Sequence, residues 1–271
     1  MLHLAQRLYR YRGLLLTLTQ RDLKARYRGS VLGFLWSLVN PALLLLVYSF
    51  VFNTIFQPRD DSVTTFGPYA LFLATGVIPW IWIQTSWLEG SQALVANAGL
   101  IRKATFPAEL LPVVSALSNL VHLVLALPII ALAFGVTALA GQHVSLGPSA
   151  LLAPLVVLLQ IPMVVGLTLG FAALNVHFKD VKDILTNLLT LLFFATPILY
   201  SLESLGGLPW VQAVVARNPF TPFMIGYQKT LFYGQVPGVG LWLEMVVWSG
   251  LAWAFGAFIF DRLSETLVEA V

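Results

Sequence analysis

Long apolar segments recur along the chain, and short polar segments separate them. Six of these segments approach or exceed the roughly 20 residues that an α-helix needs to cross the hydrocarbon core of a bilayer. They are residues 31–56, 66–88, 110–140, 149–174, 184–202 and 239–260. The fifth is the shortest, and it continues into a stretch rich in proline and glycine. The pattern predicts an all-α integral membrane protein with six transmembrane helices.

Two segments do not follow the spanning pattern. Residues 1–30 place basic residues among Leu and Tyr, which is typical of an amphipathic helix lying in the membrane interface. Residues 203–237 hold two short apolar stretches, broken by Asn218-Pro219 and by Pro222. Broken helices at membrane depth persist only against protein or a water-filled cavity, so we expect a re-entrant helical hairpin here. An ordinary outer loop with amphipathic helices is the alternative.

The basic residues predict the orientation of the spans. Loops and ends that follow an even number of spans hold 12 Lys and Arg residues, and the opposite side holds three. Cytoplasmic loops carry the excess of basic residues, so both termini are expected in the cytoplasm. We therefore predict a single transmembrane domain, residues 1–271. Its parts are a cytoplasmic interfacial helix (1–30), spans one to five (31–202), an outer re-entrant hairpin (203–237), span six (238–260) and a cytoplasmic tail (261–271).

Composition agrees with membrane residence. Apolar residues make up 58% of the 271-residue chain and charged residues only 10%, whereas a soluble domain carries about 25% charged residues. A net charge of +3 is too small to indicate a nucleic-acid partner. The absence of cysteine excludes disulfides and thiolate metal sites.

The chain lacks the sequence motifs of a nucleotide-binding site and of a metal-dependent catalytic site. It contains no G-x-x-x-x-G-K-[ST] segment to cradle a nucleotide triphosphate, and no H-E-x-x-H metal motif. His122 is the one ionisable residue near the middle of a predicted span, where such residues are functional candidates. We favour a neutral imidazole that hydrogen-bonds a neighbouring helix. The chain therefore has the architecture of a transporter that takes its energy from a partner.

Several segments resemble, in order along the chain, the signatures of one family. Residues 21–41, RDLKARYRGSVLGFLWSLVNP, resemble the first span of ABC-2 type permeases that export polysaccharides. The other matching segments are LATGVIPWIWIQTS (73–86), NAGLIRKATFPAELLPV (97–113), LNVHFKDVKDIL (174–185), TPILYSLESL (196–205), NPFTPF (218–223) and FDRLSETLVEAV (260–271). The permeases of O-antigen exporters are the most similar members, with teichoic-acid and capsule exporters close to them.

This resemblance implies a transport subunit rather than an enzyme. Such permeases form homodimers, bind two copies of a separate ATPase, and move a lipid-linked polysaccharide across the bacterial inner membrane. The chain itself is then expected to bind no cofactor, because ATP and Mg belong to the partner ATPase. Membrane lipids are further expected partners, and nucleic acid is not.

The resemblance also assigns a coupling function to residues 97–109, a cytoplasmic loop that would sit in a groove of the ATPase. A basic loop that only obeys the positive-inside rule is the alternative. Apolar groups in a loop that is otherwise expected to be polar mark an interface. The predicted contacts are Leu100, Ile101, Arg102, Lys103 and Phe106.

A basic run precedes the first span. We expect it to receive the pyrophosphate of the lipid-linked substrate, because a guanidinium pairs with phosphate in a bidentate way. Contact with anionic lipid headgroups is the alternative, and the two are compatible. The predicted residues are Arg21, Lys24, Arg26 and Arg28.

Aromatic residues are frequent on the predicted spans. Their flat apolar faces can stack on the C–H faces of sugar rings, so they are candidates to line a glycan channel. The interfacial aromatic belt and ordinary helix packing are the alternatives, and the belt suits Trp80, Trp82 and Trp210. The predicted channel residues are Tyr48, Phe52, Phe56, Trp87, Phe193, Phe194 and Tyr200.

Two other functions remain open at this point. One is an ABC-2 permease for a small lipid or drug, although such permeases usually lack a basic interfacial helix combined with this aromatic content. The other is a polytopic glycosyl or prenyl transferase, for which acidic metal-binding motifs would be expected. Asp60-Asp61 is the only adjacent acidic pair, and it falls on the predicted outer side.

Overall fold

The computed structural model describes residues 2–51, 66–101, 106–139 and 147–267, and within these ranges all regular structure is helical. The helical elements are α1 (Leu2–Arg10), α2 (Arg12–Arg26), η1 (Gly33–Leu35), α3 (Trp36–Phe50), α4 (Phe66–Ala96), α5 (Ala98–Ile101), α6 (Leu110–Leu139), η4 (Pro148–Leu152), α7 (Ala153–His177), α8 (Val181–Phe194), η5 (Glu203–Leu205), α9 (Pro209–Ala216), α10 (Thr221–Tyr227), η6 (Gln228–Phe232) and α11 (Val239–Ser264).

Four helices are long and apolar enough to cross a membrane: α4, α6, α7 with its preceding η4, and α11. They correspond to the second, third, fourth and sixth predicted spans. The helix α3 within the first predicted span has 15 described residues, and residues 52–65 lie outside the described part. In the fifth span, α8 has only 14 residues, or about 21 Å of helix, which is less than the roughly 30 Å of a bilayer core.

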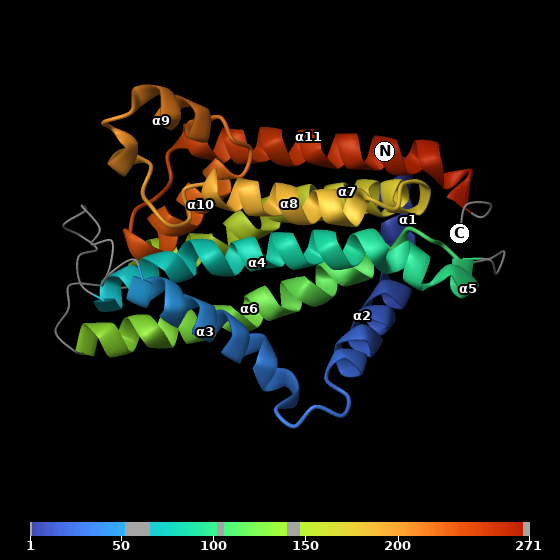
Figure 1. The fold of residues 1–271 in the computed structure, drawn as a ribbon, viewed down its shortest axis with the longest axis horizontal. Coiled ribbons are helices and arrows are strands. Elements are labelled where there is room, and N and C mark those ends of the chain that lie inside the picture. Colours follow the sequence, from blue (N-terminus) through green and yellow to red (C-terminus); the bar gives the residue numbers. More distant parts are fainter. Residues whose placement is uncertain (1, 52–65, 102–105, 140–146, 268–271) are drawn as a thin grey trace.

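The long helices lie side by side along the longest axis of the molecule (Figure 1). One end of this bundle gathers α1, α5 and the C-terminal end of α11, and α9 lies at the opposite end. Two side-chain contacts hold the first of these ends together. His177 at the end of α7 bonds Thr266 at 2.9 Å, and Arg7 of α1 pairs with Glu109 just before α6 at 2.8 Å.

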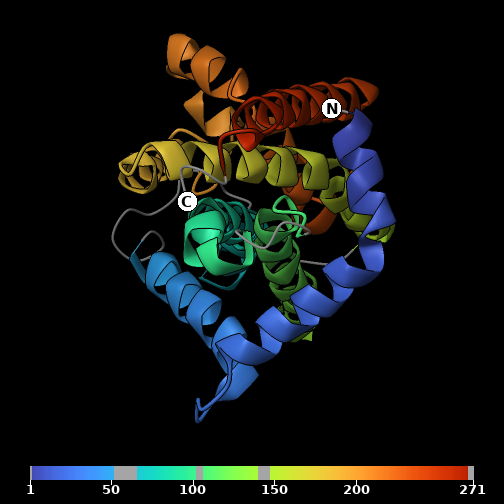
Figure 2. The same ribbon diagram turned by 90° about the vertical axis from the view of Figure 1, so that its right-hand side faces the viewer.

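The N-terminal helices form two arms on the outside of the bundle. Figure 2 shows α1–α2 and α3 converging at residues 27–35, with α4 and α6 in the angle between them. Gly29 and Gly33 have φ angles of 83° and 49° in this connection. Glycine adopts such left-handed backbone without a steric penalty, which allows the chain to reverse between α2 and α3.

Helix α4 is the centre of the bundle, and indole nitrogens fasten it to its neighbours. The Nε1 of Trp82 donates to the Ala116 carbonyl of α6 at 3.1 Å. The Nε1 of Trp87 donates to the Val164 carbonyl of α7 at 3.3 Å. A buried indole N–H needs a partner, so these bonds fix the rotation of α4 against both helices.

Helices α7 and α11 approach each other closely through glycine. A Cβ on Gly170 would lie 3.1 Å from the Cα of Gly256, and a Cβ on Gly256 would overlap the Gly166 carbonyl. The hydroxyl of Ser249 on α11 also donates to the Leu159 carbonyl of α7. Small residues at such contacts let two membrane helices pack backbone against backbone.

The segment after α8 turns back into the bundle. Its residue Phe220 packs against α4, with its ring 5.7 Å from the ring of Trp80 and 5.6 Å from that of Trp87. From there α10 and η6 return toward the N-terminal end of α4, where Phe232 lies 5.5 Å from Phe72. The segment 218–232 therefore lies along about 15 residues of α4, or roughly 22 Å of helix.

The glycine contact between α7 and α11 is open to a direct test. We expect Gly256→Ala to lower the stability of the folded chain by about 1–3 kcal/mol or more, because the added methyl meets backbone rather than a flexible side chain. Thermal unfolding of the purified chain in detergent measures this effect. Gly250→Ala is the matched control, because it lies on the same helix with no heavy atom within 4 Å of its added Cβ. Equal unfolding midpoints for the two variants would contradict the close contact.

Candidate functional site

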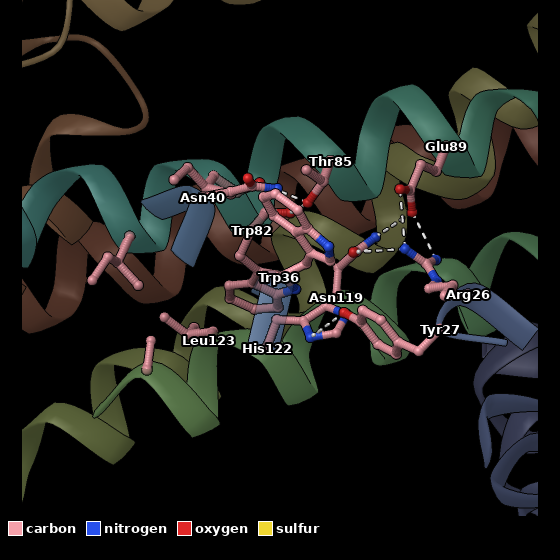
Figure 3. A pocket seen from close by; sticks show the side chains of 13 residues that line it. Arg26, Tyr27, Trp36, Asn40, Trp82, Thr85, Glu89, Asn119, His122 and Leu123 are labelled. Carbon is pink, nitrogen blue, oxygen red and sulfur yellow. Dashed lines mark hydrogen bonds and ion pairs between the residues drawn. The ribbon is translucent and has the colours of Figure 1, made fainter. Parts of the chain in front are cut away.

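A cavity of about 220 Å³ lies in the angle between the N-terminal arms and the α4–α6 pair (Figure 3). Arg26, Glu89 and Asn119 gather at one end, and mostly apolar side chains of α4 and α6 continue the wall, with the Asn40 amide of α3 beside them. The lining residues are Arg26, Tyr27, Trp36, Asn40, Ile78, Ile81, Trp82, Thr85, Glu89, Asn119, His122, Leu123 and Ala126.

The polar end is built around Arg26, the last residue of α2. Its Nε lies 2.7 Å from Asp22, one helical turn earlier. Its Nη1 and Nη2 lie 3.0 and 2.7 Å from the two carboxylate oxygens of Glu89 on α4. Asn119 on α6 accepts from Nη1 at 3.3 Å and donates to Glu89 at 2.7 Å. We call these four side chains the Arg26 cluster.

The Arg26 cluster joins three helices through groups that are distant in sequence. Burial by itself lowers the pKa of Arg26, but the hydrogen bonds and ion pairs with Glu89 and Asp22 outweigh it, so the pKa is raised and the guanidinium stays charged. A charge removed from bulk water is tolerated when it is paired and hydrogen-bonded. The cluster therefore fixes the end of α2 on the α4–α6 pair.

This arrangement divides the four basic residues expected to receive the substrate pyrophosphate. Arg21, Lys24 and Arg28 are exposed, whereas Arg26 is half-buried and already paired with two carboxylates. The first three remain predicted phosphate contacts on the surface of α2.

Glu89 and Asn119 are the residues that sequence reasoning missed. Glu89 directly follows the predicted second span, 66–88, and no sequence pattern singles it out. In the structure α4 continues for seven further residues to Ala96, so the carboxylate projects from a helix. The i, i+4 pair Asp22–Arg26 was visible in the sequence, but nothing local linked either residue to Glu89.

His122 faces the same cavity. Its Nε2 lies 3.2 Å from the Tyr27 hydroxyl at the end of α2, and the two rings meet edge to face. The expectation of a hydrogen-bonded His122 is confirmed, but its partner comes from the N-terminal arm rather than from another span.

The predicted coupling loop is described in part. Residues 98–101 form the four-residue helix α5, while Arg102 and Lys103 lie outside the described residues. Leu100 and Phe106 are half-buried, and Ile101 is buried with 5% of its surface exposed. Ile101 therefore packs into this chain and, in this conformation, offers almost no surface to a partner.

The predicted channel aromatics fall into three groups. Phe52, Phe56 and the side chain of Tyr48 lie outside the described part of the chain. Trp87 and Phe193 are buried, with 1% and 9% exposure, and they pack inside the subunit instead of lining an open path. The third group is Phe194, which is 59% exposed, and half-buried Tyr200. The Tyr200 hydroxyl donates to the Phe194 carbonyl at 2.9 Å.

The interfacial belt stays a prediction for one of the three tryptophans and is wrong for the other two. Trp210 on α9 is 72% exposed, as a belt residue should be. Trp80 and Trp82 are 1% and 2% exposed, so the belt interpretation is wrong for them. Their position along α4 matched a belt, but packing against α6, α8 and the returning segment covers both.

Helix α8 carries a polar face that sequence inspection did not single out. Four of its exposed polar residues follow helical spacing i, i+3, i+4 and i+7, which places them on one side. They are Asp183, Thr186, Asn187 and Thr190, and we call them the α8 polar stripe. The adjoining side, formed by Leu185, Leu189 and Phe193, is buried against the bundle.

Comparison with known proteins gives consistent relatives. The family profile described as ABC-2 type transporter matches residues 13–232. The O-antigen export system permease protein RfbA of Myxococcus xanthus is 38% identical over 276 residues, which covers 100% of both chains. Two proteins of Klebsiella pneumoniae with the same description are 30% and 26% identical, each over 94% of both chains.

The Arg26 cluster predicts that α2 is held in place by charge pairing. We expect Arg26→Met to broaden the distance distribution between spin labels on α2 and α6, because the guanidinium that bridges the helices is gone. The chain has no cysteine, so Ala25→Cys with Leu132→Cys gives a clean label pair. Arg21→Met, which removes an exposed charge from the same helix, is the control. An unchanged distribution in Arg26→Met would show that other contacts hold α2.

Proposed function

The chain belongs to the ABC-2 type transporter family, and we propose that it is the permease subunit of an exporter for an O-antigen-like polysaccharide. The family profile covers most of the chain, and the relatives described as O-antigen export permeases match 94–100% of it. The proposed substrate is a lipid-linked glycan, and the proposed location is the bacterial inner membrane.

The α8 polar stripe is the structural observation that carries this proposal. Hydroxyl, amide and carboxylate groups on the exposed face of a membrane helix are unfavourable against lipid, so they face protein or a water-filled path. Thr186, Asn187 and Thr190 each donate to a carbonyl of their own helix. Their side-chain oxygens keep capacity to accept from sugar hydroxyls. Exposed Phe194 at the end of the stripe adds an aromatic face.

A second copy of the chain is the proposed cover for this path. One chain leaves the stripe open along its whole length, and only protein can shield it from the hydrocarbon. A homodimer in which two α8 helices face one central path satisfies this requirement with a closed symmetric interface.

The energy for export is proposed to come from two copies of a separate ATPase, which would hold ATP and Mg. Residues 97–109 are the proposed docking element, with half-buried Leu100 and Phe106 as the apolar contacts and Arg102 and Lys103 as the basic ones. The Arg7–Glu109 ion pair connects the end of this loop to α1. A movement of the loop would therefore reach the N-terminal arm directly.

The proposed orientation places α1, α5 and the end of α11 on the cytoplasmic side. The excess of Lys and Arg at this end supports that assignment. Helices α1 and α2 would then lie in the cytoplasmic interface, with exposed Arg21, Lys24 and Arg28 toward lipid or substrate phosphates. The segment from α9 to η6 would be a re-entrant hairpin in the outer leaflet.

Export should depend on the α8 polar stripe. We expect the double variant Asn187→Leu, Thr190→Val to lower glycan export by about tenfold or more, because two groups worth about 1 kcal/mol of hydrogen bonding each leave the path. Surface glycan on intact cells, normalised to the amount of inserted permease, measures this. Ile184→Leu, an exposed apolar exchange on the same helix, is the control and should export normally. Full export by the double variant would remove the stripe from the proposed path.

ATP hydrolysis should require a partner that docks on residues 97–109. In nanodiscs we expect no hydrolysis by the chain alone, and hydrolysis by the complex with its co-expressed ATPase. Phe106→Ala should reduce co-purification of the ATPase, because an apolar contact at the interface is lost. Leu208→Ala, an exposed apolar truncation beside α9 at the opposite end, should leave the complex intact. Hydrolysis by the chain alone would contradict the assignment of ATP to the partner.

A further inference from the structure

The Glu89 carboxylate occupies Arg26 in the way that a phosphate would. Its two oxygens lie 3.0 and 2.7 Å from Nη1 and Nη2, so the guanidinium presents both terminal nitrogens to one acceptor group (Figure 3). Carboxylate and phosphate share this bidentate geometry with arginine. The fork of Arg26 is thus formed and aimed, but it is filled by a side chain of the same protein.

The cavity beyond this fork has a charged end and an apolar end, which matches the charged headgroup and apolar tail of a lipid. Glu89 lies seven residues before the end of α4, or about 10 Å above the proposed cytoplasmic end of the helix. Farther along the two helices the wall becomes apolar, formed by Ile78 and Ile81 of α4 and by Leu123 and Ala126 of α6. A lipid of the cytoplasmic leaflet places its phosphate and its first apolar units in the same order.

We propose that Glu89 is a built-in competitor that occupies the phosphate site of Arg26 until a phosphate-bearing lipid displaces it. This inference rests on the proposed function, since the lipid-linked substrate would supply that headgroup. Glu89 then determines how tightly the permease holds its substrate lipid, and Arg26 is the residue that binds the phosphate.

The charges of the Arg26 cluster explain why the Glu89 carboxylate must move away before a phosphate can bind. With Glu89 in place, one guanidinium faces two carboxylates, Glu89 and Asp22, and this net negative charge repels an incoming phosphate. The Glu89 side chain is 43% exposed, so it can rotate away into water. Glu89 also accepts a 2.7 Å hydrogen bond from Asn119, and its departure would release one N–H of that amide to donate to the phosphate.

The surroundings of the fork favour the exchange. Exposed Lys24 and Arg28 lie two residues before and after Arg26 in the sequence and add positive charge to this end of α2. The Tyr27–His122 pair lies on the adjoining wall and adds further hydrogen-bonding groups. Phosphate binding in place of Glu89 would keep α2 bridged to α6 through Arg26 and Asn119.

Binding of farnesyl pyrophosphate to the purified chain in nanodiscs of neutral lipid tests the proposal. We expect Glu89→Gln to tighten the dissociation constant by about tenfold or more, because the isosteric amide removes both the competitor and its charge. Arg26→Gln should weaken binding. The double variant should bind no more tightly than Arg26→Gln, because the gain acts through the guanidinium. Glu203→Gln removes the same charge at the opposite end and should leave binding unchanged.

Several outcomes would overturn the proposal. They are unchanged or weaker binding by Glu89→Gln, a gain that survives in the double variant, and no binding by any variant. If Glu89→Gln does not fold, Asp22→Asn removes the other carboxylate of the cluster and should tighten binding as well; no gain there would also refute the competition. The assay contains no ATPase and no glycan, so its failure would leave the proposed export function untouched, and failure of export would leave the binding result standing.

Discussion

The structure depends on one constraint, namely that backbone polar groups without water must find partners inside the protein. The strongest case is the end of α8, which stops within the bundle. Its last carbonyls are met by side chains: Thr196 donates to Leu192 at 2.6 Å, and Asn218 donates to Ala195 at 3.0 Å. Gln228 then donates to the Pro197 carbonyl at 2.6 Å. A short helix can end at this depth because the returning segment caps it.

That capped end organises the rest of the bundle. The residue that caps α8, Asn218, directly precedes the turn that inserts Phe220 between Trp80 and Trp87, so the same segment completes the core around α4. Farther along the returning segment, the Tyr227 hydroxyl donates to Gln160 of α7 at 2.6 Å. One side of α8 is thereby buried against the bundle, and the polar stripe lies on its exposed surface. The proposed glycan path and the proposed hairpin therefore both follow from the early end of α8.

The second organising feature is a charged network that joins three helices. Arg26 is 63 residues from Glu89 and 93 from Asn119 in the sequence, yet the three side chains form one closed network. An ion pair that is partly removed from water is weak evidence for stability, because desolvation offsets much of its attraction. Its partial exposure makes an exchange of partners physically reasonable. It also explains why a basic run that looks uniform in sequence divides into surface cations and one bridging residue.

The amino-acid sequence alone determined the membrane residence, four of the long helices, the asymmetry of basic residues and the family, because apolar length, charge placement and ordered motifs are local properties. The tertiary structure decided which polar and aromatic groups meet. It buried Trp80 and Trp87, ended α8 early, and extended α4 past residue 88 so that Glu89 faces Arg26. The physical reason is that the position of a polar or aromatic side chain in a membrane protein depends on the group that it contacts. When that group lies on another helix, the contact leaves no periodic signal along the chain.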